Sequence, residues 1–338
     1  MPRPSLGSLL AWLGVLVSLV FTYVAARDVQ LDRVWDALAS SNQWFLLPSV
    51  AALVVAVFLR TARWRYVFQA ESRPALRAVT EALLIGYLFN NILPARAGEA
   101  ARVVALHQST DASRLKTVGT ITLERVYDVL TLLMLLFFAA PFLPEVTWLR
   151  RAAVLAVVLV IVVIAAVVIL TLFGDRPVRF LLRPLERVPR ISRARAEQAA
   201  ANLVIGVAGI RNVKLAAGAF LLTTASWLAL AVSAWALLFA FDLDLDPGFA
   251  FGAGLLVVVA TNLAQVLPSS PGALGVFEAA AQLALGAFGI DESSALSYAI
   301  LLHAVNFFPF VLVGYVVLHR HAGYVRRRPR EAETGPET

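Results

Sequence analysis

The sequence predicts an all-α polytopic membrane protein with about six full transmembrane helices plus two broken re-entrant helical hairpins, arranged as an inverted repeat. Of its 338 residues, 60% are hydrophobic and 15% are charged, whereas soluble domains carry about 25% charged residues. The mean hydropathy is +0.78. Several apolar runs also reach the length of about 20 residues that crosses a bilayer. This composition argues against a water-soluble single domain.

Six apolar runs have the length of a spanning helix, or nearly so. They cover Leu6–Ala26, Trp44–Arg60, Thr117–Leu143, Ala152–Phe173, Lys214–Phe241 and Ser293–His319. The first run follows Arg3 and in this respect resembles a signal peptide, but it is long and lacks a small-x-small cleavage site before Arg27. We therefore expect a retained span.

The placement of arginine predicts the orientation of these spans. Arginines cluster after the second run, across residues 176–214 and again in residues 320–330. All three clusters lie on one side if the N-terminus is cytoplasmic, as the positive-inside rule requires. On the other side, Arg27 and Arg33 are diluted by aspartates, and Arg150 and Arg151 are the one pair that this orientation misplaces. The sequence thus predicts a multi-pass protein of the cell (inner, cytoplasmic) membrane with both termini in the cytoplasm.

Two further apolar stretches are interrupted by polar residues, proline and glycine. Ala78–Leu106 is broken at residues 90–99, and Gly248–Gly289 is broken at residues 267–272. Proline removes a backbone donor from a helix, and non-helical backbone at membrane depth survives only inside protein or beside a wet cavity. We interpret both stretches as re-entrant hairpins. Two full crossings per stretch are the alternative, which suits the longer legs of the second stretch better.

The order of spans and broken hairpins occurs twice along the chain. It divides the sequence into a first membrane repeat (1–143), a second (144–321) with a cytoplasmic basic segment (174–213), and a disordered cytoplasmic tail (322–338). The first hairpin opens from the cytoplasm and the second from outside, so the repeat is inverted. Asn91, Pro94 and Gly98 have the same spacing as Gln265, Pro268 and Gly272. Interrupted helices at matching positions of inverted halves indicate a transport site near the midplane.

The first break contains the first group of candidate substrate-binding residues. They are Asn90, Asn91, Pro94, Arg96, Gly98, Glu99 and Arg102. A half-helix that begins after Pro94 presents free N–H groups and a partial positive charge, which suits a phosphate. Arg96 and Arg102 would add planar donors for its oxygens. The alternative is a cytoplasmic loop with a helix cap.

Two other groups carry charge within apolar stretches, where an ionisable side chain is a candidate for function. Glu124 and Asp128 share one helix face at i and i+4, and Arg125 stands three residues before Asp128, so the trio can form an ion-pair set. Either a structural clamp or a direct contact with substrate would explain this trio.

The third group is Pro268, Ser270, Pro271, Gly272, Gly275 and Glu278. Its alternative is a tight turn between two spans, with Glu278 paired to an arginine.

Motifs for catalysis, metals and cofactors are missing from the sequence. It contains no cysteine, P-loop, Gly-x-Ser-x-Gly or dinucleotide glycine motif, and its histidines have no metal-ligand spacing. Asp242, Asp244 and Asp246 resemble the metal-binding Asp-x-Asp of some glycosyltransferases, but their place between two spans favours a solvated loop. The basic charge lies at the ends of apolar runs, which is not a nucleic-acid patch. We expect no catalytic residue, metal, cofactor or nucleic acid.

Three motifs together carry a resemblance to a known family. They are Gly86–Arg102, Glu124-Arg125-x-x-Asp128 and Pro271-Gly272-x-x-Gly275-Val276-x-Glu278. In this order, from Leu6 to about His321, the chain resembles the flippase-like family named after the transmembrane region of lysylphosphatidylglycerol synthase. Bifunctional members pair a lipid-translocating membrane domain with a soluble aminoacyltransferase domain. Because this chain ends at Thr338, we expect no such soluble domain and no synthase activity.

These observations predict a lipid flippase that moves an anionic or polyprenyl-linked lipid between leaflets by alternating access. A separate lipid-modifying enzyme is an expected partner, and a homodimer stays open. One alternative is an integral-membrane transferase that uses Glu99, Glu124 or Asp128 as base. A second is a non-catalytic scaffold for envelope lipid assembly. A third is a transporter of a soluble small molecule.

Overall fold

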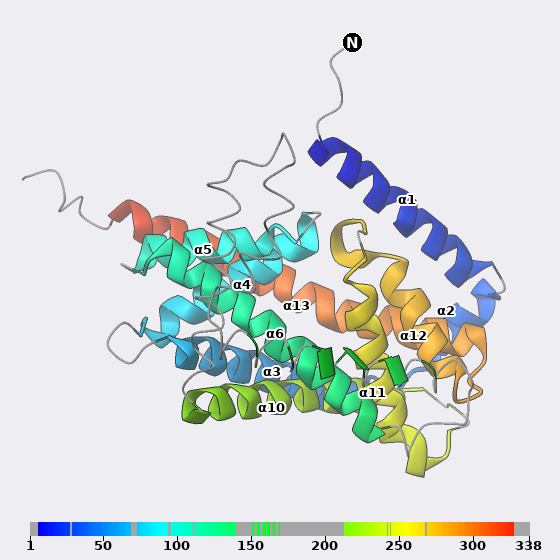
Figure 1. Ribbon diagram of the computed structural model, residues 1–338. Coiled ribbons are helices and arrows are strands. Elements are labelled where there is room, and N and C mark those ends of the chain that lie inside the picture. The colour runs from blue at the N-terminus through cyan, green and yellow to red at the C-terminus, as the bar shows by residue number, and fades with distance from the viewer. Residues whose placement is uncertain are drawn as a thin grey trace, which may run out of the picture.

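The computed structural model is a bundle of helices, which Figure 1 shows from one side. It describes residues 6–139 and 213–327 apart from 28, 69–72, 94–95, 111, 242, 244 and 268, together with isolated positions between 151 and 169. This part of the chain is helical and contains no strand. The prediction of an all-α protein is therefore confirmed.

The helices follow one another with short connections. In chain order they are α1 (Leu6–Ala26), α2 (Leu31–Ser40), η1 (Gln43–Phe45), α3 (Leu46–Val67), α4 (Leu76–Ile92), α5 (Gly98–Ser109), α6 (Arg114–Ala139), α10 (Val213–Leu238), α11 (Pro247–Ala264), η6 (Pro271–Ala273), α12 (Val276–Gly286) and α13 (Glu292–Arg327). The predicted span over residues 152–173, the start of the second repeat and the basic segment up to residue 212 lie outside the described residues or are described only at isolated positions.

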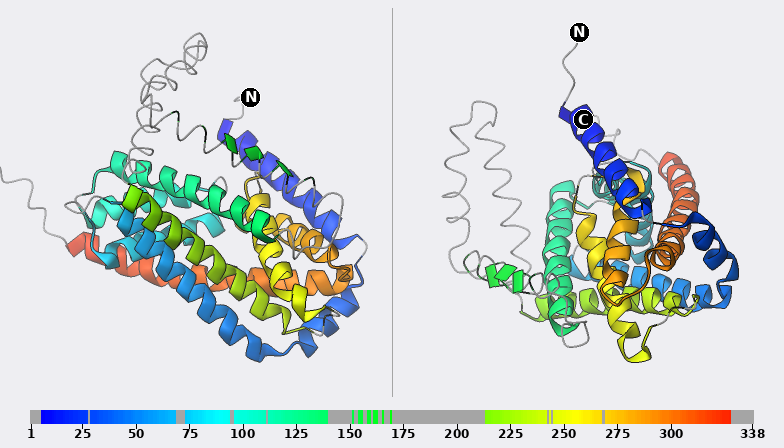
Figure 2. Two further views of the ribbon diagram at one scale, coloured as in Figure 1. Left: turned by 60° about the horizontal axis from the view of Figure 1, so that its bottom comes forward. Right: turned by 90° about the vertical axis from the view of Figure 1, so that its right-hand side faces the viewer.

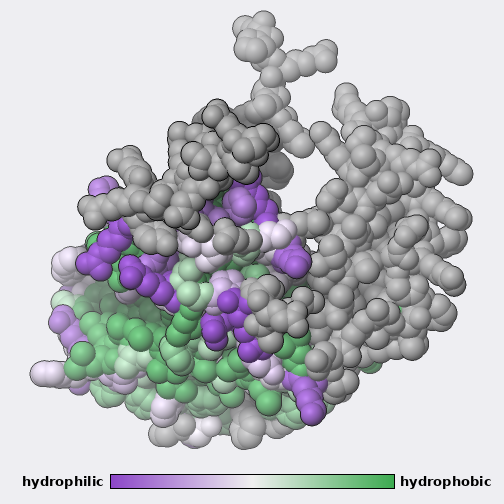
Figure 3. All heavy atoms as spheres, turned by 90° about the vertical axis from the view of Figure 1, so that its left-hand side faces the viewer, coloured by the Kyte–Doolittle hydropathy of each residue, from purple (hydrophilic) through white to green (hydrophobic). Residues whose placement is uncertain are grey.

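Three helices are long and apolar enough to cross a membrane: Gln43–Val67, Lys214–Leu238 and Glu292–Gly323. They correspond to three of the six predicted spans. Two further predicted spans are helices here, since α1 covers Leu6–Ala26 and α6 covers Arg114–Ala139. Large apolar side chains such as Phe58, Leu221 and Leu312 are exposed on the three long helices. One end of the molecule shows a broad hydrophobic area beside hydrophilic groups (Figure 3), as expected of a surface in contact with lipid.

Helices α3 and α10 pack against each other as an antiparallel pair along one side of the bundle. Ser49 and Ser233 share a hydrogen bond of 3.0 Å at one end, and the Tyr66 hydroxyl donates to the Lys214 carbonyl oxygen, 3.5 Å away, at the other. Figure 2 shows α3, α6, α10 and α13 running alongside one another. The main apolar core lies between α6, α10, α11, α12 and α13. In a membrane such contacts are held by close packing and hydrogen bonds rather than by exclusion of water.

The first broken hairpin is formed by α4 and α5, which pack closely because two glycines meet. A Cβ atom on Gly98 would lie less than 3.0 Å from the Gly86 carbonyl oxygen and from the Asn90 side chain. The Asn90 Oδ1 atom accepts the Gly98 amide at 2.9 Å and so satisfies a free donor at the start of α5. Arg96 precedes this helix with a positive φ of 54°. Pro94 lies outside the described residues.

The second broken hairpin consists of α11, η6 and α12. Gly272 and Gly275 have φ of 70° and 78°, which L side chains rarely adopt. The Glu278 Oε2 atom accepts the Gly275 amide at 2.7 Å and thereby caps α12. Helix α1 covers this turn, because the Ser18 hydroxyl accepts the Ser270 amide at 2.8 Å. Pro268 lies outside the described residues.

Asp291 caps α13 beyond the end of this hairpin and outside the spans. Its Oδ1 atom accepts the amides of Ser293 and Ser294, both at 3.1 Å. A hydrogen bond from the Ser294 side chain, followed by these amide bonds, holds the pKa of the Asp291 carboxyl below its usual value. Asp291 therefore begins the long helix α13 as an ionised cap.

We expect Gly98→Ala to disrupt the first hairpin, because the added methyl group has no room between Gly86 and Asn90. Overpacking of this kind typically costs about 1–3 kcal/mol. Thermal unfolding of the purified protein in detergent measures the loss. The matched control is Gly286→Ala, whose Cβ atom would meet nothing within 4 Å. Equal unfolding temperatures for the two variants would contradict the close contact.

Candidate functional site

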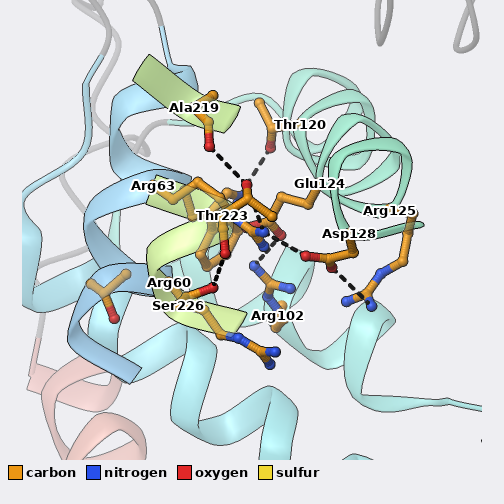
Figure 4. Close-up of polar contacts among 12 residues, drawn as sticks. Arg60, Arg63, Arg102, Thr120, Glu124, Arg125, Asp128, Ala219, Thr223 and Ser226 are labelled. Atoms are coloured by element: carbon orange, nitrogen blue, oxygen red, sulfur yellow. Dashed lines mark hydrogen bonds and ion pairs between the residues drawn. The ribbon is translucent and has the colours of Figure 1, made fainter. Parts of the chain in front are cut away.

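A cluster of charged side chains lies inside the bundle, between α3, α5, α6 and α10 (Figure 4). Its centre is Arg63 on α3, which is 3% exposed. The Arg63 Nη1 atom donates to Asp128 Oδ1 at 2.6 Å, and Nη2 donates to Glu124 Oε1 at 2.9 Å. Nη1 also donates to the Thr223 hydroxyl of α10 at 3.2 Å. One guanidinium thus joins three helices.

Arg102 of α5 binds the other oxygen of the same glutamate. Its Nη2 atom lies 2.8 Å from Glu124 Oε2, and its guanidinium carbon lies 3.9 Å from the centre of the Trp64 ring. Its side chain passes over Gly86, where any larger residue would collide with it. Trp64 is fixed in turn by a hydrogen bond from Nε1 to the Thr120 hydroxyl, 3.0 Å long. The Glu124 carboxylate, 0% exposed, is therefore shared by two arginines.

Asp128 connects this buried cluster to its exposed edge. The Trp227 Nε1 atom donates to Asp128 Oδ1 at 3.2 Å, and Arg125 Nη1 lies 3.4 Å from Oδ2, as the i, i+3 spacing predicts. Arg125 also pairs with Glu99 of α5 at 3.2 Å. The side chains of Arg125 and Glu99 are 43% and 32% exposed. A ligand can therefore reach the Arg125–Glu99 pair more easily than the cluster behind it.

The two breaks lie against each other. The Arg96 Nη2 atom of the first break donates to the Gln265 carbonyl oxygen of the second at 3.1 Å. A Cβ atom on Gly272 would lie 3.6 Å from the Asn91 carbonyl oxygen. The Asn91 side-chain amide donates to the Phe307 carbonyl oxygen of α13 at 3.5 Å. Residues from both halves of the sequence thus meet where the helices are interrupted.

Glu278 has a histidine as its side-chain partner. Its Oε1 atom lies 2.5 Å from His303 Nδ1 of α13. The His303 ring packs 4.5 Å from the Phe277 ring and 6.0 Å from the Phe307 ring, measured between ring centres. The alternative interpretation, in which Glu278 pairs with an arginine, is not met among the described residues. Glu278 combines a helix cap with a partly buried acid–imidazole pair.

The predicted residues therefore fall into three places. Arg102 lies with Glu124, Arg125 and Asp128 in the ion-pair cluster, whereas Arg96 lies at the junction of the breaks. Ser270, Pro271, Gly272 and Gly275 form the second turn, with Glu278 behind it. Arg102 is thus paired with Glu124. It does not lie beside Arg96 as a second donor for a phosphate, contrary to the prediction from the sequence. Asp242 and Asp244 lie outside the described residues.

Sequence reasoning missed several members of the site. Arg63 belongs to the arginine cluster that the sequence places on the cytoplasmic side, after a predicted span that ends at Arg60. The helix continues to Val67 and carries both arginines inward. The i, i+3 spacing of Arg60 and Arg63 in an apolar helix was the available signal. Trp64, Trp227 and His303 have no comparable pattern in the sequence.

The described residues contain no group of three histidine, aspartate or glutamate side chains that could hold a metal ion. The arginines instead neutralise the carboxylates of the cluster. Its chemistry is the recognition of charge and the cross-linking of helices.

The sequence matches a known family of membrane proteins over most of its length. A family model described as the lysylphosphatidylglycerol synthase TM region matches residues 11–314. The chain belongs to this family. The match includes both breaks, the ion-pair cluster and most of α13. The resemblance carried by the three sequence motifs is thereby confirmed.

Two relatives align with this chain over different fractions of their own length. Glycosyltransferase AglD of Haloferax volcanii is 25% identical over 320 residues, which are 87% of this chain and 51% of AglD. UPF0104 membrane protein MJ1078 of Methanocaldococcus jannaschii is 26% identical over 245 residues, 71% of this chain and 97% of that protein. The chain thus spans about half the length of AglD and almost all of MJ1078.

We expect Arg63→Met to destabilise the protein by about 3–5 kcal/mol, because it leaves two carboxylates buried without their shared cation. Denaturant unfolding in detergent measures this loss. The control is Arg65→Met two residues along the helix, where Nε donates to the Pro74 carbonyl oxygen. Adding Glu124→Gln to Arg63→Met should cost less than the sum of the two single changes. Additive losses of stability in the double variant would contradict the proposed pairing of Arg63 with Glu124. Equal losses for Arg63→Met and Arg65→Met would contradict it too.

Proposed function

We propose that the protein is a lipid flippase that moves an anionic or polyprenyl-linked lipid between the two leaflets. The observation that carries the proposal is the contact between the two breaks, from Arg96 to the Gln265 carbonyl oxygen. Polar, non-helical backbone within an apolar bundle is tolerated where it is enclosed by protein or lines a polar path. The family and the relatives support a role in handling lipids or lipid-linked glycans.

In this proposal the head group binds at the junction of the breaks. Arg96 offers an exposed guanidinium there, and the start of α5 adds the partial positive charge of a helix N-terminus. Arg96 also lies close enough to Arg125 and Glu99 for their charges to interact. A phosphate would receive planar donors from this group. The acyl or prenyl chains would stay in the surrounding lipid.

The inverted repeat would provide the movement. Rocking of one half against the other would expose the junction first to one leaflet and then to the other. The ion-pair cluster would hold α3, α5 and α6 together as one rigid part during this motion, because Arg63 and Arg102 share Glu124. Without a nucleotide motif in the sequence, lipid gradients, ion coupling or a partner would supply the drive.

A transferase acting on a lipid-linked sugar is the second candidate, because one relative is named a glycosyltransferase. The chain spans about half of that relative, so the activity in its name belongs to the whole protein. Of the acids considered as a base, Glu124 is closed off by Arg63 and Arg102, whereas Glu99 is partly exposed. Turnover of a labelled sugar donor by the purified chain would favour this candidate.

A reconstitution assay tests the flippase proposal. Purified protein in vesicles should move a labelled anionic or polyprenyl-phosphate lipid faster than empty vesicles do. Arg96→Gln should lower this rate about tenfold, since a hydrogen bond to a charged group contributes about 1.5–3 kcal/mol. The matched control is Arg114→Gln, which removes an exposed arginine at the start of α6.

Two results would count against the proposal. One is a wild-type rate no higher than that of empty vesicles across anionic and polyprenyl lipids. The other is an equal rate for Arg96→Gln and wild type, which would remove the junction from the transport path. Native mass spectrometry of the gently purified protein identifies any lipid that it retains. That lipid is the one to label for the assay.

A further inference from the structure

Arg60 lies in the apolar helix α3 and forms no ion pair within 4.0 Å among the described residues, although its charge interacts with the Asp128 carboxyl. It stands one turn before Arg63 on α3, and its Nη1 atom donates to the Tyr87 hydroxyl at 3.4 Å. Its guanidinium carbon lies 4.6 Å from the centre of the Trp227 ring. Its Nε and Nη2 atoms are buried and have no hydrogen-bond partner. Arg63 and Arg102 both bind carboxylates. In each of them only the Nε atom is buried without a hydrogen-bond partner.

The two unpartnered atoms of Arg60 form one edge of its guanidinium plane. Nε–H and Nη2–H point in parallel along that edge, so together they can bind two oxygens of a carboxylate or phosphate group. Nη1 is held by Tyr87 on the opposite side, and Trp227 covers a face of the plane. The side chain is thus fixed in position. Its bidentate edge has no partner and is covered by protein atoms, so a ligand would reach it when neighbouring side chains move aside.

The charges around Arg60 do not balance. With Arg96, the groups whose charges interact are five guanidinium groups, those of Arg60, Arg63, Arg96, Arg102 and Arg125, and three carboxylates, those of Glu99, Glu124 and Asp128. Water would satisfy the free donors of Arg60 but would leave the excess positive charge without a counter-ion. An unpaired charge is costly at membrane depth. An anion is the ligand that removes both deficits.

The location of Arg60 connects the ion-pair cluster to the first break. Its partner Tyr87 lies one turn before Asn90, whose side chain caps α5. Arg60 is seven residues from Val67, the end of α3, which corresponds to about 10 Å along a helix. A ligand bound here would lie within the spanning segment and next to the proposed transport path.

We propose that Arg60 binds the oxyanion of a phosphate or phosphodiester group through Nε and Nη2, with Trp227 and Tyr87 holding the guanidinium in place. The proposal deepens the proposed function and rests on it for a lipid as the source of that group. Free phosphate offers the same chemistry, so the test has separate arms for the two sources.

The test measures ligand-induced stabilisation of the full chain in micelles of dodecyl maltoside, a detergent that contains no phosphate group. One arm adds short-chain phosphatidylglycerol and the other adds inorganic phosphate. We expect the wild type to be stabilised and Arg60→Met to bind the effective probe at least about tenfold more weakly, as loss of a bidentate charged contact requires. The control Arg77→Met removes a side chain that is 83% exposed and pairs with Glu81, and it should bind as the wild type does.

The arms identify the source of the oxyanion. Stabilisation by the lipid alone assigns the site to a lipid head group, whereas stabilisation by inorganic phosphate as well assigns it to the phosphate group itself. Stabilisation by neither probe would overturn the proposal. Equal binding by Arg60→Met and wild type would overturn it too.

Stability of the empty protein separates a binding role from a structural one. Arg60→Met should change the unfolding temperature little, because Arg60 forms no ion pair within 4.0 Å among the described residues. Arg63→Met should lower it, because two carboxylates lose their cation. An equal decrease for both variants would make Arg60 a structural residue and overturn the proposal.

The transport assay keeps the two proposals apart. Binding that depends on Arg60 in a protein that moves no lipid would support the anion site and contradict the flippase. Lipid movement that is unchanged in Arg60→Met, together with unchanged binding, would support the flippase and contradict the anion site.

Discussion

The Arg63 guanidinium lies inside the helix bundle, where it binds the carboxylates of Glu124 and Asp128. Each of these charges would be costly alone in a membrane, so none of the three side chains can be placed without the others. Their pairing fixes α3 against α6, and Arg102 extends the same constraint to α5 through Glu124. The first broken hairpin is therefore attached to the core by charge, as well as by the close contact of Gly86 and Gly98.

A second constraint acts where the helices are interrupted. Interrupted helices leave backbone groups that must find partners inside the protein. Asn90 caps α5, Glu278 caps α12, and Arg96 donates to the Gln265 carbonyl oxygen of the opposite break. Each break thus supplies its own cap, while Arg96 ties the two together. This combination of a rigid cluster and a polar junction is what an alternating-access mechanism would need.

Much of the fold followed from hydropathy, because the apolar periodicity of a spanning helix is local. The bounds of α1 are the predicted ones, and three predicted spans are helices long enough to cross the membrane. The i, i+3 spacing also predicted the pair of Arg125 with Asp128. Arg63 was missed because charge usually ends a span, and only a partner on another helix allows α3 to continue past it. His303 was missed for a related reason, since its partner Glu278 lies 25 residues away in sequence.

The sequence by itself determined that the chain is a helical membrane protein, where its helices are interrupted, and which family it resembles. These properties depend on composition, on local spacing and on the positions of proline and glycine. The tertiary structure decided which charges meet: Arg102 binds Glu124 rather than standing beside Arg96, and Arg60 keeps an edge without a partner. The physical reason is that a buried charge is stabilised by groups from other helices, whose approach no local pattern records.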